Sequence, residues 1–219
     1  MQQIKAVIFD LDQTLLDRTT SLKLFLNWQV NFLQLLPQHL KQRFIQRFIE
    51  LDANGSVWKD LVYRQLIEEF NISKYSEQHL LEMYIYDFNK FCTAFNGVEA
   101  TIEKLYKNGF KLGLISNGKT PFQEHNFQAL GLSEYFSSVI VSEAVGLRKP
   151  NPEIFQLACQ QLSVEPEQCL FIGDNEVADI QGALSVGMQT FLIDFEKKIT
   201  TTSAHYYATT FNELFSYLR

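Results

Sequence analysis

Cysteine is scarce in this chain of 219 residues, which contains three, at Cys92, Cys159 and Cys169. Their number is odd and no two of them have the CxxC spacing, so the sequence predicts neither a disulfide framework nor a zinc site. A chain of this length buries about 70% of its unfolded surface and can fold without such cross-links. Free cysteines suit a reducing compartment, and we expect a cytoplasmic location.

Long hydrophobic runs are also missing. No apolar stretch approaches the roughly 18 residues of a membrane-spanning helix. The chain begins Met-Gln-Gln-Ile-Lys, without the apolar region and small-residue cleavage site of a signal peptide. We therefore expect neither insertion into a membrane nor secretion.

Positive charge is in deficit. The chain has 19 Lys and Arg residues against 25 Asp and Glu residues, which gives a formal net charge of -6. Proteins that bind nucleic acid neutralise phosphates with clustered Lys and Arg, so we do not expect a nucleic-acid partner. The GxxxxGK[ST], GxGxxG and GxSxG motifs are absent, which leaves P-loop, dinucleotide-binding and serine-hydrolase functions without support.

Short apolar runs, by contrast, recur along the chain. Five of them are typical of strands buried on both faces of a parallel sheet. They span residues 6–9, 112–115, 139–141, 170–172 and 190–193. Helical segments that each stop at a glycine alternate with the later runs, at 99–108, 120–130 and 177–186. The alternation predicts an α/β fold with a doubly wound parallel sheet, and Thr210–Glu213 predicts a capping box that opens a last helix.

Residues 17–92 do not follow this alternation. We expect four helices there, at about 20–36, 38–51, 56–70 and 76–91. The stretch contains nine basic and nine acidic residues, so the net charge of -6 lies entirely in the rest of the chain. We therefore predict an all-helical domain at 17–92, inserted into a core formed by residues 1–16 and 93–219.

The residues that follow the first four predicted strands suit the binding of ions and phosphate. They are Asp10, Asp12 and Thr14 after the first strand, Ser116 and Asn117 after the second, Lys149 after the third, and Asp174 and Asp179 after the fourth. Ligands bind at the carboxyl ends of the strands in an open α/β sheet. Several carboxylates at that edge repel one another unless a cation lies among them, and Mg²⁺ binds carboxylates together with substrate phosphate.

These residue types favour phosphoryl transfer, in which the protein positions groups and neutralises charge. An aspartate also acts directly as a nucleophile in some phosphoryl transfers and forms an aspartyl-phosphate. Asp10 and Asp12 are two residues apart, so in an extended segment their side chains point to the same side.

Four segments of the sequence, taken in order, resemble the four motifs of the haloacid dehalogenase-like (HAD) hydrolase superfamily. They are FDLDQTL at 9–15, LISNG at 114–118, RKPNP at 148–152 and IGDNEVAD at 172–179. The resemblance implies a Rossmann-like catalytic core with residues 17–92 as a C1-type cap domain. It further implies a Mg²⁺-dependent phosphatase that hydrolyses a small phosphate monoester, such as a sugar phosphate or a nucleoside monophosphate.

The resemblance also implies roles for the acidic residues. Asp10 is expected to be the nucleophile and a Mg²⁺ ligand. Asp12 is expected to protonate the leaving group, to activate the hydrolytic water and to bind Mg²⁺ through its backbone carbonyl, and Asp174 is the remaining metal ligand. Asp179 is expected to orient Lys149 or water near the metal. Ala178 precedes it, where family members often have Asn.

The phosphate-binding residues follow from the same resemblance. Thr14 is expected to support the loop of the first motif, while Ser116 and the backbone amide of Asn117 hold the phosphoryl oxygens. Lys149 is expected to offset the negative charge of Asp10 and of the phosphate.

Three alternative functions stay open on this fold. A phosphomutase uses the same core, a 2-haloacid dehalogenase releases halide, and a non-catalytic module binds a ligand without turnover. Asp12 favours the phosphatase over the dehalogenase, because a halide leaves without a proton whereas an alkoxide needs one. The physiological substrate, the cap residues that contact it and the oligomeric state do not follow from the sequence.

Overall fold

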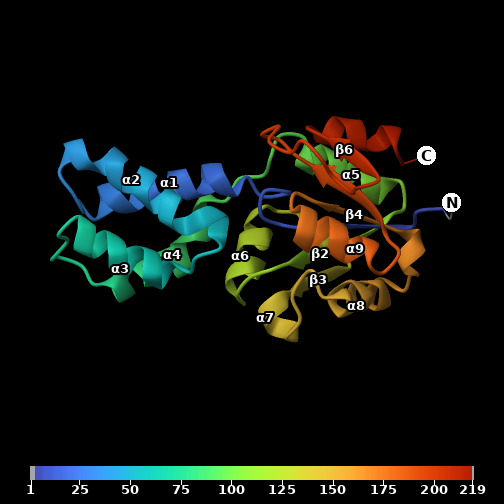
Figure 1. Cartoon of the computed structure of the whole chain (residues 1–219), viewed down its shortest axis with the longest axis horizontal. Coiled ribbons are helices and arrows are strands. Elements are labelled where there is room, and N and C mark those ends of the chain that lie inside the picture. The colour runs from blue at the N-terminus through green and yellow to red at the C-terminus, as the bar shows by residue number, and fades with distance from the viewer. Residues whose placement is uncertain (1–2, 219) are drawn as a thin grey trace. The chain divides into compact units, whose positions relative to one another are not determined.

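The computed structural model describes residues 3–218 and divides into two compact units (Figure 1). One unit contains the described residues up to Arg18 together with those from Thr93 onward, and the other contains Thr19–Cys92. Within residues 3–218, every helix is too short or too polar to traverse a lipid bilayer.

The larger unit contains a sheet of six parallel strands in the order β3-β2-β1-β4-β5-β6. The strands are β1 (Ala6–Phe9), β2 (Lys111–Ser116), β3 (Ser138–Val141), β4 (Cys169–Gly173), β5 (Gln189–Ile193) and β6 (Tyr206–Ala208). The doubly wound α/β fold and the five strands expected from apolar runs are therefore confirmed. The prediction missed β6, because this edge strand is short and only partly buried and has no apolar run.

The central strand β1 places the first motif at the middle of the sheet. All four of its side chains are buried, and Ala6 pairs with Lys111 of β2 on one side and with Cys169 of β4 on the other. The N–H of Asp10 continues this pairing by donating to Ile172 O at 2.9 Å. The strand order reverses beside β1, which is where open α/β sheets bind their ligands.

Helices and short 3-10 or π segments connect the strands. They are α5 (Val98–Lys107), α6 (Phe122–Ala129), α7 (Ser142–Val145), α8 (Pro152–Leu162), the π-helix Glu176–Gln181 and α9 (Gly182–Leu184). Successive residues of β1 pack against different partners. Ile8 joins an apolar cluster with Phe155 of α8 and Phe171 of β4, whereas the Phe9 ring contacts Phe136 and Phe211. The sheet is thus buried on both faces, as its continuous apolar strands predict.

Two predicted helices of this unit differ from the structure. The segment expected as one helix over 177–186 is the π-helix followed by α9. The chain's last element is a 3-10 helix, Phe211–Ser216, and the predicted capping box is wrong. The Thr210 hydroxyl donates to the Glu213 carboxylate instead of accepting from its N–H, which bonds Thr210 O at 3.4 Å.

The smaller unit is a bundle of four α-helices. They are α1 (Arg18–Phe32), α2 (Gln38–Asp52), α3 (Lys59–Glu69) and α4 (Glu77–Asp87), with 3-10 turns at Ala53–Gly55 and Phe88–Phe91. Its interior is aromatic: Phe25 lies 5.5 Å from Tyr84 and Phe48 lies 5.2 Å from Tyr63 between ring centroids. Most of the unit's large aromatic residues therefore serve packing.

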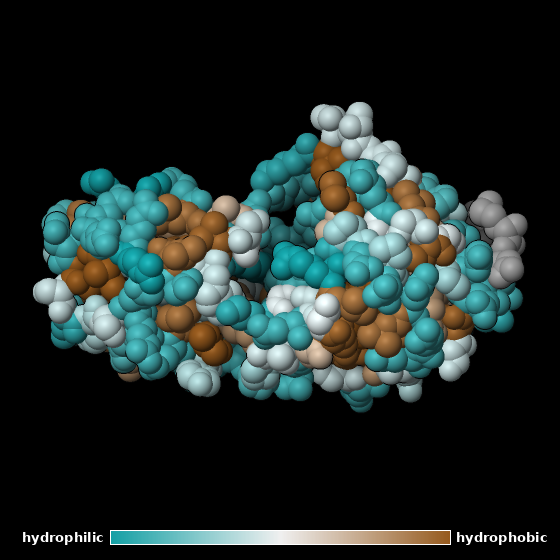
Figure 2. All heavy atoms as spheres, turned by 60° about the horizontal axis from the view of Figure 1, so that its bottom comes forward, coloured by the Kyte–Doolittle hydropathy of each residue, from teal (hydrophilic) through white to brown (hydrophobic). Residues whose placement is uncertain are grey.

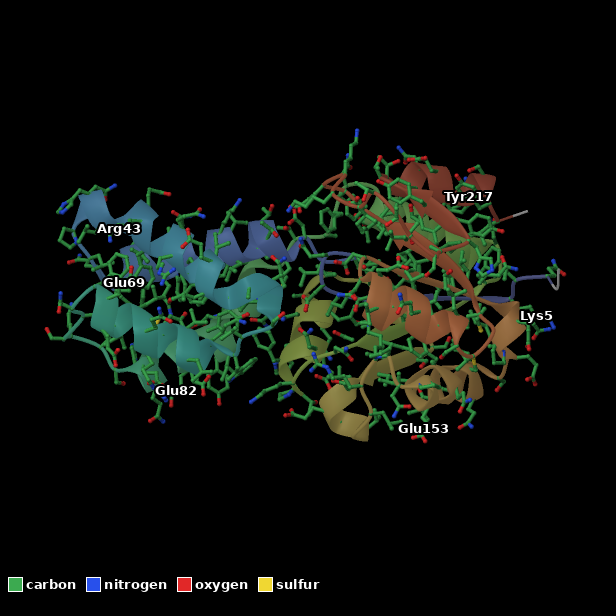
Figure 3. All side chains as sticks on the ribbon, in the orientation of Figure 1. Lys5, Arg43, Glu69, Glu82, Glu153 and Tyr217 are labelled. Atoms are coloured by element: carbon green, nitrogen blue, oxygen red, sulfur yellow. The ribbon has the colours of Figure 1, made fainter. Side chains whose placement is uncertain are left out.

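The surface of the helical unit is mainly polar. Figure 3 shows Arg43 and Glu69 on helices α2 and α3, and Arg47 pairs with Glu69 at 2.9 Å while one third exposed. Figure 2 shows isolated apolar patches within a largely hydrophilic surface on both units. Leu24 and Phe32 are among the exposed apolar side chains of the helical unit.

Candidate active site

At the carboxyl edge of the sheet, Lys149 contacts residues that belong to or follow three different strands, β1, β2 and β4. Its Nζ lies 2.5 Å from Asp10 Oδ1 and 2.7 Å from Asp179 Oδ1, and it donates to Ile115 O of β2 at 2.9 Å. Lys149 and Asp179 are 3% and 1% exposed and Asp10 is 7% exposed, so these charges interact with little screening by water. The structure therefore brings Asp10, Lys149 and Asp179 together in one buried ion-pair cluster.

Burial shapes the protonation of this cluster. It raises the pKa of Asp10 to about 7, although Lys149 acts in the opposite direction, and Asp179 and Asp12 add to the rise. Burial also raises the pKa of Asp174 well above its usual range, helped by the charges of Asp10 and Asp179. For Lys149, burial works to lower the pKa, but the two carboxylates outweigh it and the net shift is upward. The lysine is therefore a permanent cation, and the carboxylates need more positive charge than it supplies.

The carboxylates fit a divalent cation. One oxygen each from Asp10, Asp174 and Asp179 lies within 4.8 Å of the others. Oxygen donors of this kind are what Mg²⁺ prefers, and three carboxylates facing one lysine leave negative charge for it to neutralise. Asp179 already pairs with Lys149 through Oδ1 and accepts from Asn175 N–H at 3.0 Å through Oδ2. Asp10 and Asp174 are therefore the side chains best placed to hold Mg²⁺.

Asp12 is not one of the three clustered carboxylates. It is half-buried, and its Oδ2 accepts a hydrogen bond of 2.8 Å from Gln123 Nε2. Ser116, at the end of β2 and 1% exposed, accepts a second hydrogen bond from the same Nε2 at 2.9 Å. Gln123 is a polar residue of the site that sequence reasoning missed, because it lies inside a helix and not directly after a strand.

Asn117 uses its side chain to hold the loop that carries Lys149. Its Nδ2 donates to Lys149 O at 3.0 Å, and its Oδ1 accepts from Lys149 N–H at 2.9 Å. The prediction assigned only the backbone amide of Asn117 to phosphate binding. The side chain has the separate task of fixing the third motif to the end of β2.

Thr14 lies in the turn after β1. It is fully buried, its N–H donates to Leu11 O at 3.3 Å, and its hydroxyl has no hydrogen-bond partner within residues 3–218. Leu11 O also accepts from the N–H groups of Leu15 and Leu16 at 3.0 and 2.9 Å. The turn is thus held by its backbone, with the Thr14 side chain packed inside it.

Gly173 and Asp179 approach each other closely at the end of β4. A Cβ built on Gly173 overlaps Asp179 Oδ2, so only glycine permits this approach. Asn175 completes the turn by accepting the N–H groups of Val177 and Ala178 at 3.0 and 2.9 Å. Within the fourth motif, Gly173 therefore leaves room for the Asp179 side chain, and Asn175 caps the helix that carries Asp179. Together they place Asp179 beside Lys149.

We expect Gly173→Ala to displace Asp179 and to lower kcat by about 10- to 100-fold, because small misplacements of site residues are costly. The added methyl is also expected to destabilise the fold by about 1–3 kcal/mol. Gly109→Ala is the matched control, since Gly109 has φ +83° and open space around it. This substitution is expected to cost about 1–2 kcal/mol through backbone strain alone. Equal kcat values for the two variants at matched stability loss would contradict the role given to Gly173.

The chain was compared with protein-family models, with characterised proteins and with solved structures. Residues 7–193 match the family model described as haloacid dehalogenase-like hydrolase. A glyceraldehyde 3-phosphate phosphatase of Methanothermobacter thermautotrophicus is 30% identical, with 88% of this chain and 87% of that protein covered. A second, of Pyrococcus furiosus, is 28% identical, with 90% and 83% covered. The solved structure of the HAD-hydrolase YfnB of Bacillus subtilis, bound to magnesium, shares this fold at a TM-score of 0.82, with 23% identity and all of both chains covered.

Proposed function

The chain belongs to the haloacid dehalogenase-like hydrolases and is a phosphatase of that family, and we propose that it hydrolyses a small phosphate monoester with Mg²⁺ through an aspartyl-phosphate on Asp10. The observation that carries this proposal is the buried cluster in which Lys149 contacts Asp10 and Asp179 at 2.5 and 2.7 Å. It supplies a nucleophile beside a permanent cation, at the edge of the sheet where ligands bind.

In the first step of the proposed reaction, a carboxylate oxygen of Asp10 attacks phosphorus and the bond to the ester oxygen breaks. Asp12 donates its proton to that oxygen, so the leaving group departs as an alcohol. In the second step, Asp12 takes a proton from water as the water attacks phosphorus. Inorganic phosphate leaves, and the Asp10 carboxylate is restored.

The remaining residues stabilise charge on the phosphoryl group. The Ser116 hydroxyl and the Asn117 backbone N–H are proposed to bind its oxygens, as preorganised donors do in such sites. Lys149, whose Nζ contacts Asp10, Asp179 and Ile115 O, is proposed to offset the negative charge of the bound phosphate. Thr14 is proposed to support these residues from the turn after β1. Mg²⁺, held by Asp10, Asp174 and the backbone carbonyl of Asp12, supplies further charge neutralisation when bound.

Substrate and organisation are further parts of the proposal. The helical unit Thr19–Cys92 is proposed to be the cap domain of a cytoplasmic enzyme. The substrate is proposed to be a sugar phosphate, a nucleoside monophosphate or a similar metabolite. Because two similar proteins are glyceraldehyde 3-phosphate phosphatases, a three-carbon sugar phosphate is the first compound to test.

A panel of phosphorylated metabolites, assayed for phosphate release, tests this function. We expect Mg²⁺-dependent turnover of at least one monoester, and loss of turnover by about 100-fold or more when EDTA removes the metal, because the buried carboxylates then lack their cation. Formation of an isomer without free phosphate would indicate a phosphomutase instead. Halide release from a 2-haloacid without added metal would indicate a dehalogenase, and binding without turnover would indicate a non-catalytic module.

A further inference from the structure

The side-chain amide of Gln123 lies between two residues of the proposed active site. It is 3% exposed, and its Nε2 donates to Asp12 Oδ2 at 2.8 Å and to Ser116 Oγ at 2.9 Å. A primary amide nitrogen has two hydrogens, so both are used. One side chain therefore connects the proposed general acid with a proposed phosphate ligand.

The orientation of this amide is fixed by its other end. Gln123 Oε1 accepts from Asn126 Nδ2 at 3.3 Å, and Asn126 is itself buried. A flipped amide places Oε1 against the Asp12 carboxylate and the Ser116 oxygen, which leaves the carboxylate without this donor. The hydrogen-bond pattern thus selects the orientation in which Gln123 donates to both residues.

The loop before α6 makes room for this arrangement. A Cβ on Gly118 lies 2.5 Å from Gln123 Cγ and 3.0 Å from its Nε2, so a larger residue at position 118 pushes the amide away. The N–H of Gln123 donates to Lys119 O at 3.0 Å, which fixes the backbone of Gln123 at the start of α6. The close approach of Gln123 therefore requires glycine at position 118.

We propose that Gln123 is a positioning residue for Asp12 and Ser116 in the phosphatase reaction, an inference that rests on the function proposed above. Because Asp12 Oδ2 is engaged by Gln123, Oδ1 is the oxygen that exchanges protons with the leaving group and with water. Because Ser116 Oγ accepts from the same amide, the serine's own hydrogen is directed to a phosphoryl oxygen.

A positioning role for Gln123 can be distinguished from a merely structural role by which substrates a Gln123 variant hydrolyses more slowly. A well-placed general acid contributes about 10²- to 10⁴-fold to rate when the leaving group needs a proton. An alkyl phosphate needs that proton, whereas 4-nitrophenolate is a stable anion and leaves without one. Misplacing Asp12 therefore slows alkyl esters selectively, but general loss of structure slows both classes equally.

The test compares Gln123→Met with the unaltered protein on 4-nitrophenyl phosphate and on the best alkyl phosphate of the metabolite panel, both with Mg²⁺. The quantity measured is kcat/KM, which includes departure of the alcohol but not the later attack of water. We expect the ratio of alkyl to aryl kcat/KM to fall about 10- to 100-fold. Gln123→Glu, of nearly equal size but without the two amide hydrogens, is expected to lower the same ratio and serves if the Met variant does not fold.

Gln128→Met is the matched control, because Gln128 is an exposed glutamine on the same helix and its replacement is expected to leave the ratio unchanged. Asp12→Asn is expected to lower the ratio further, and adding Gln123→Met to it is expected to change the ratio no more. Equal losses on both esters in a folded Gln123 variant, or no loss, overturn the inference. If Asp12→Asn itself leaves the ratio unchanged, the acid role in the proposed function is wrong as well.

Discussion

Replacing Asp10 by Asn is expected to lower kcat on a phosphate monoester by about 1,000-fold or more, because the amide cannot form the aspartyl-phosphate. The fold is expected to persist. Burial raises the pKa of Asp10 to about 7, so the folded protein already disfavours a charge at this position. When Asn replaces Asp10, Lys149 keeps Asp179 as its partner at 2.7 Å. We expect the melting temperature to change by only about 2–4 °C, which corresponds to roughly 1 kcal/mol.

Two measurements separate this outcome from a general defect. During turnover of an aryl phosphate, intact-protein mass spectrometry is expected to detect one added phosphoryl group on an Asp12→Asn variant and none once Asp10→Asn is added. Glu134→Gln, an exposed acidic residue of the same unit, is expected to retain full activity. Undiminished turnover by Asp10→Asn would mean that another group attacks phosphorus.

The sheet was the most predictable part of the fold. Strands such as Ala6–Phe9 and Cys169–Gly173 are buried on both faces, so their sequences are apolar throughout and stand out from the rest of the chain. Tyr206–Ala208 lies at the edge of the sheet with its first two side chains partly exposed or exposed, so burial leaves no such pattern there. Edge strands and single-turn elements depend on contacts distant in sequence, which local patterns do not encode.

The candidate site divides in a similar way. Asp10 and Asp174 directly follow strands and Ser116 is the last residue of one, and the topology of a parallel sheet alone brings such positions to one edge. Gln123 reaches the same edge from the helix after β2, and its side chain fits there only because Gly118 has no Cβ. A glutamine within a helix carries no signal of its own, so only the three-dimensional structure could reveal its bonds to Asp12 and Ser116.

Lys149→Met is the second change for which we expect a large effect, and it acts on stability as well as activity. The lysine is buried and contacts Asp10 and Asp179 at 2.5 and 2.7 Å. Removing one partner of a buried ion pair costs about 3–5 kcal/mol, because the other charge stays buried without compensation. For a chain of this size that corresponds to a fall in melting temperature of roughly 6–20 °C. Turnover is expected to fall by about 100-fold or more as charge stabilisation at the phosphoryl group is lost.

An exposed lysine, Lys107, provides the control for Lys149→Met. Lys107 is 67% exposed and pairs with Glu103 one helical turn away at 2.6 Å. Exposed pairs of this kind contribute about 1 kcal/mol or less, so Lys107→Met is expected to change neither the melting temperature by more than a few degrees nor the activity. Equal behaviour of the two variants would show that the buried cluster does not depend on the charge of Lys149.

The pH dependence of the loss tests its electrostatic origin. In the folded protein the pKa of Asp10 is raised from 3.8 to about 7, so the folded state binds a proton more tightly than the unfolded state, and stability contributed by this group falls as pH rises through that interval. Lys149 acts to lower the pKa of Asp10, so removal of Lys149 raises that pKa further.

In the Lys149→Met variant, Asp10 is therefore largely neutral at pH 5 and needs no cation, whereas at pH 8 the ionisation of Asp10 is costly. Thermal unfolding should therefore show a smaller loss of stability for Lys149→Met at pH 5 than at pH 8, and a loss of equal size at both would mean that packing, not charge, makes the lysine necessary.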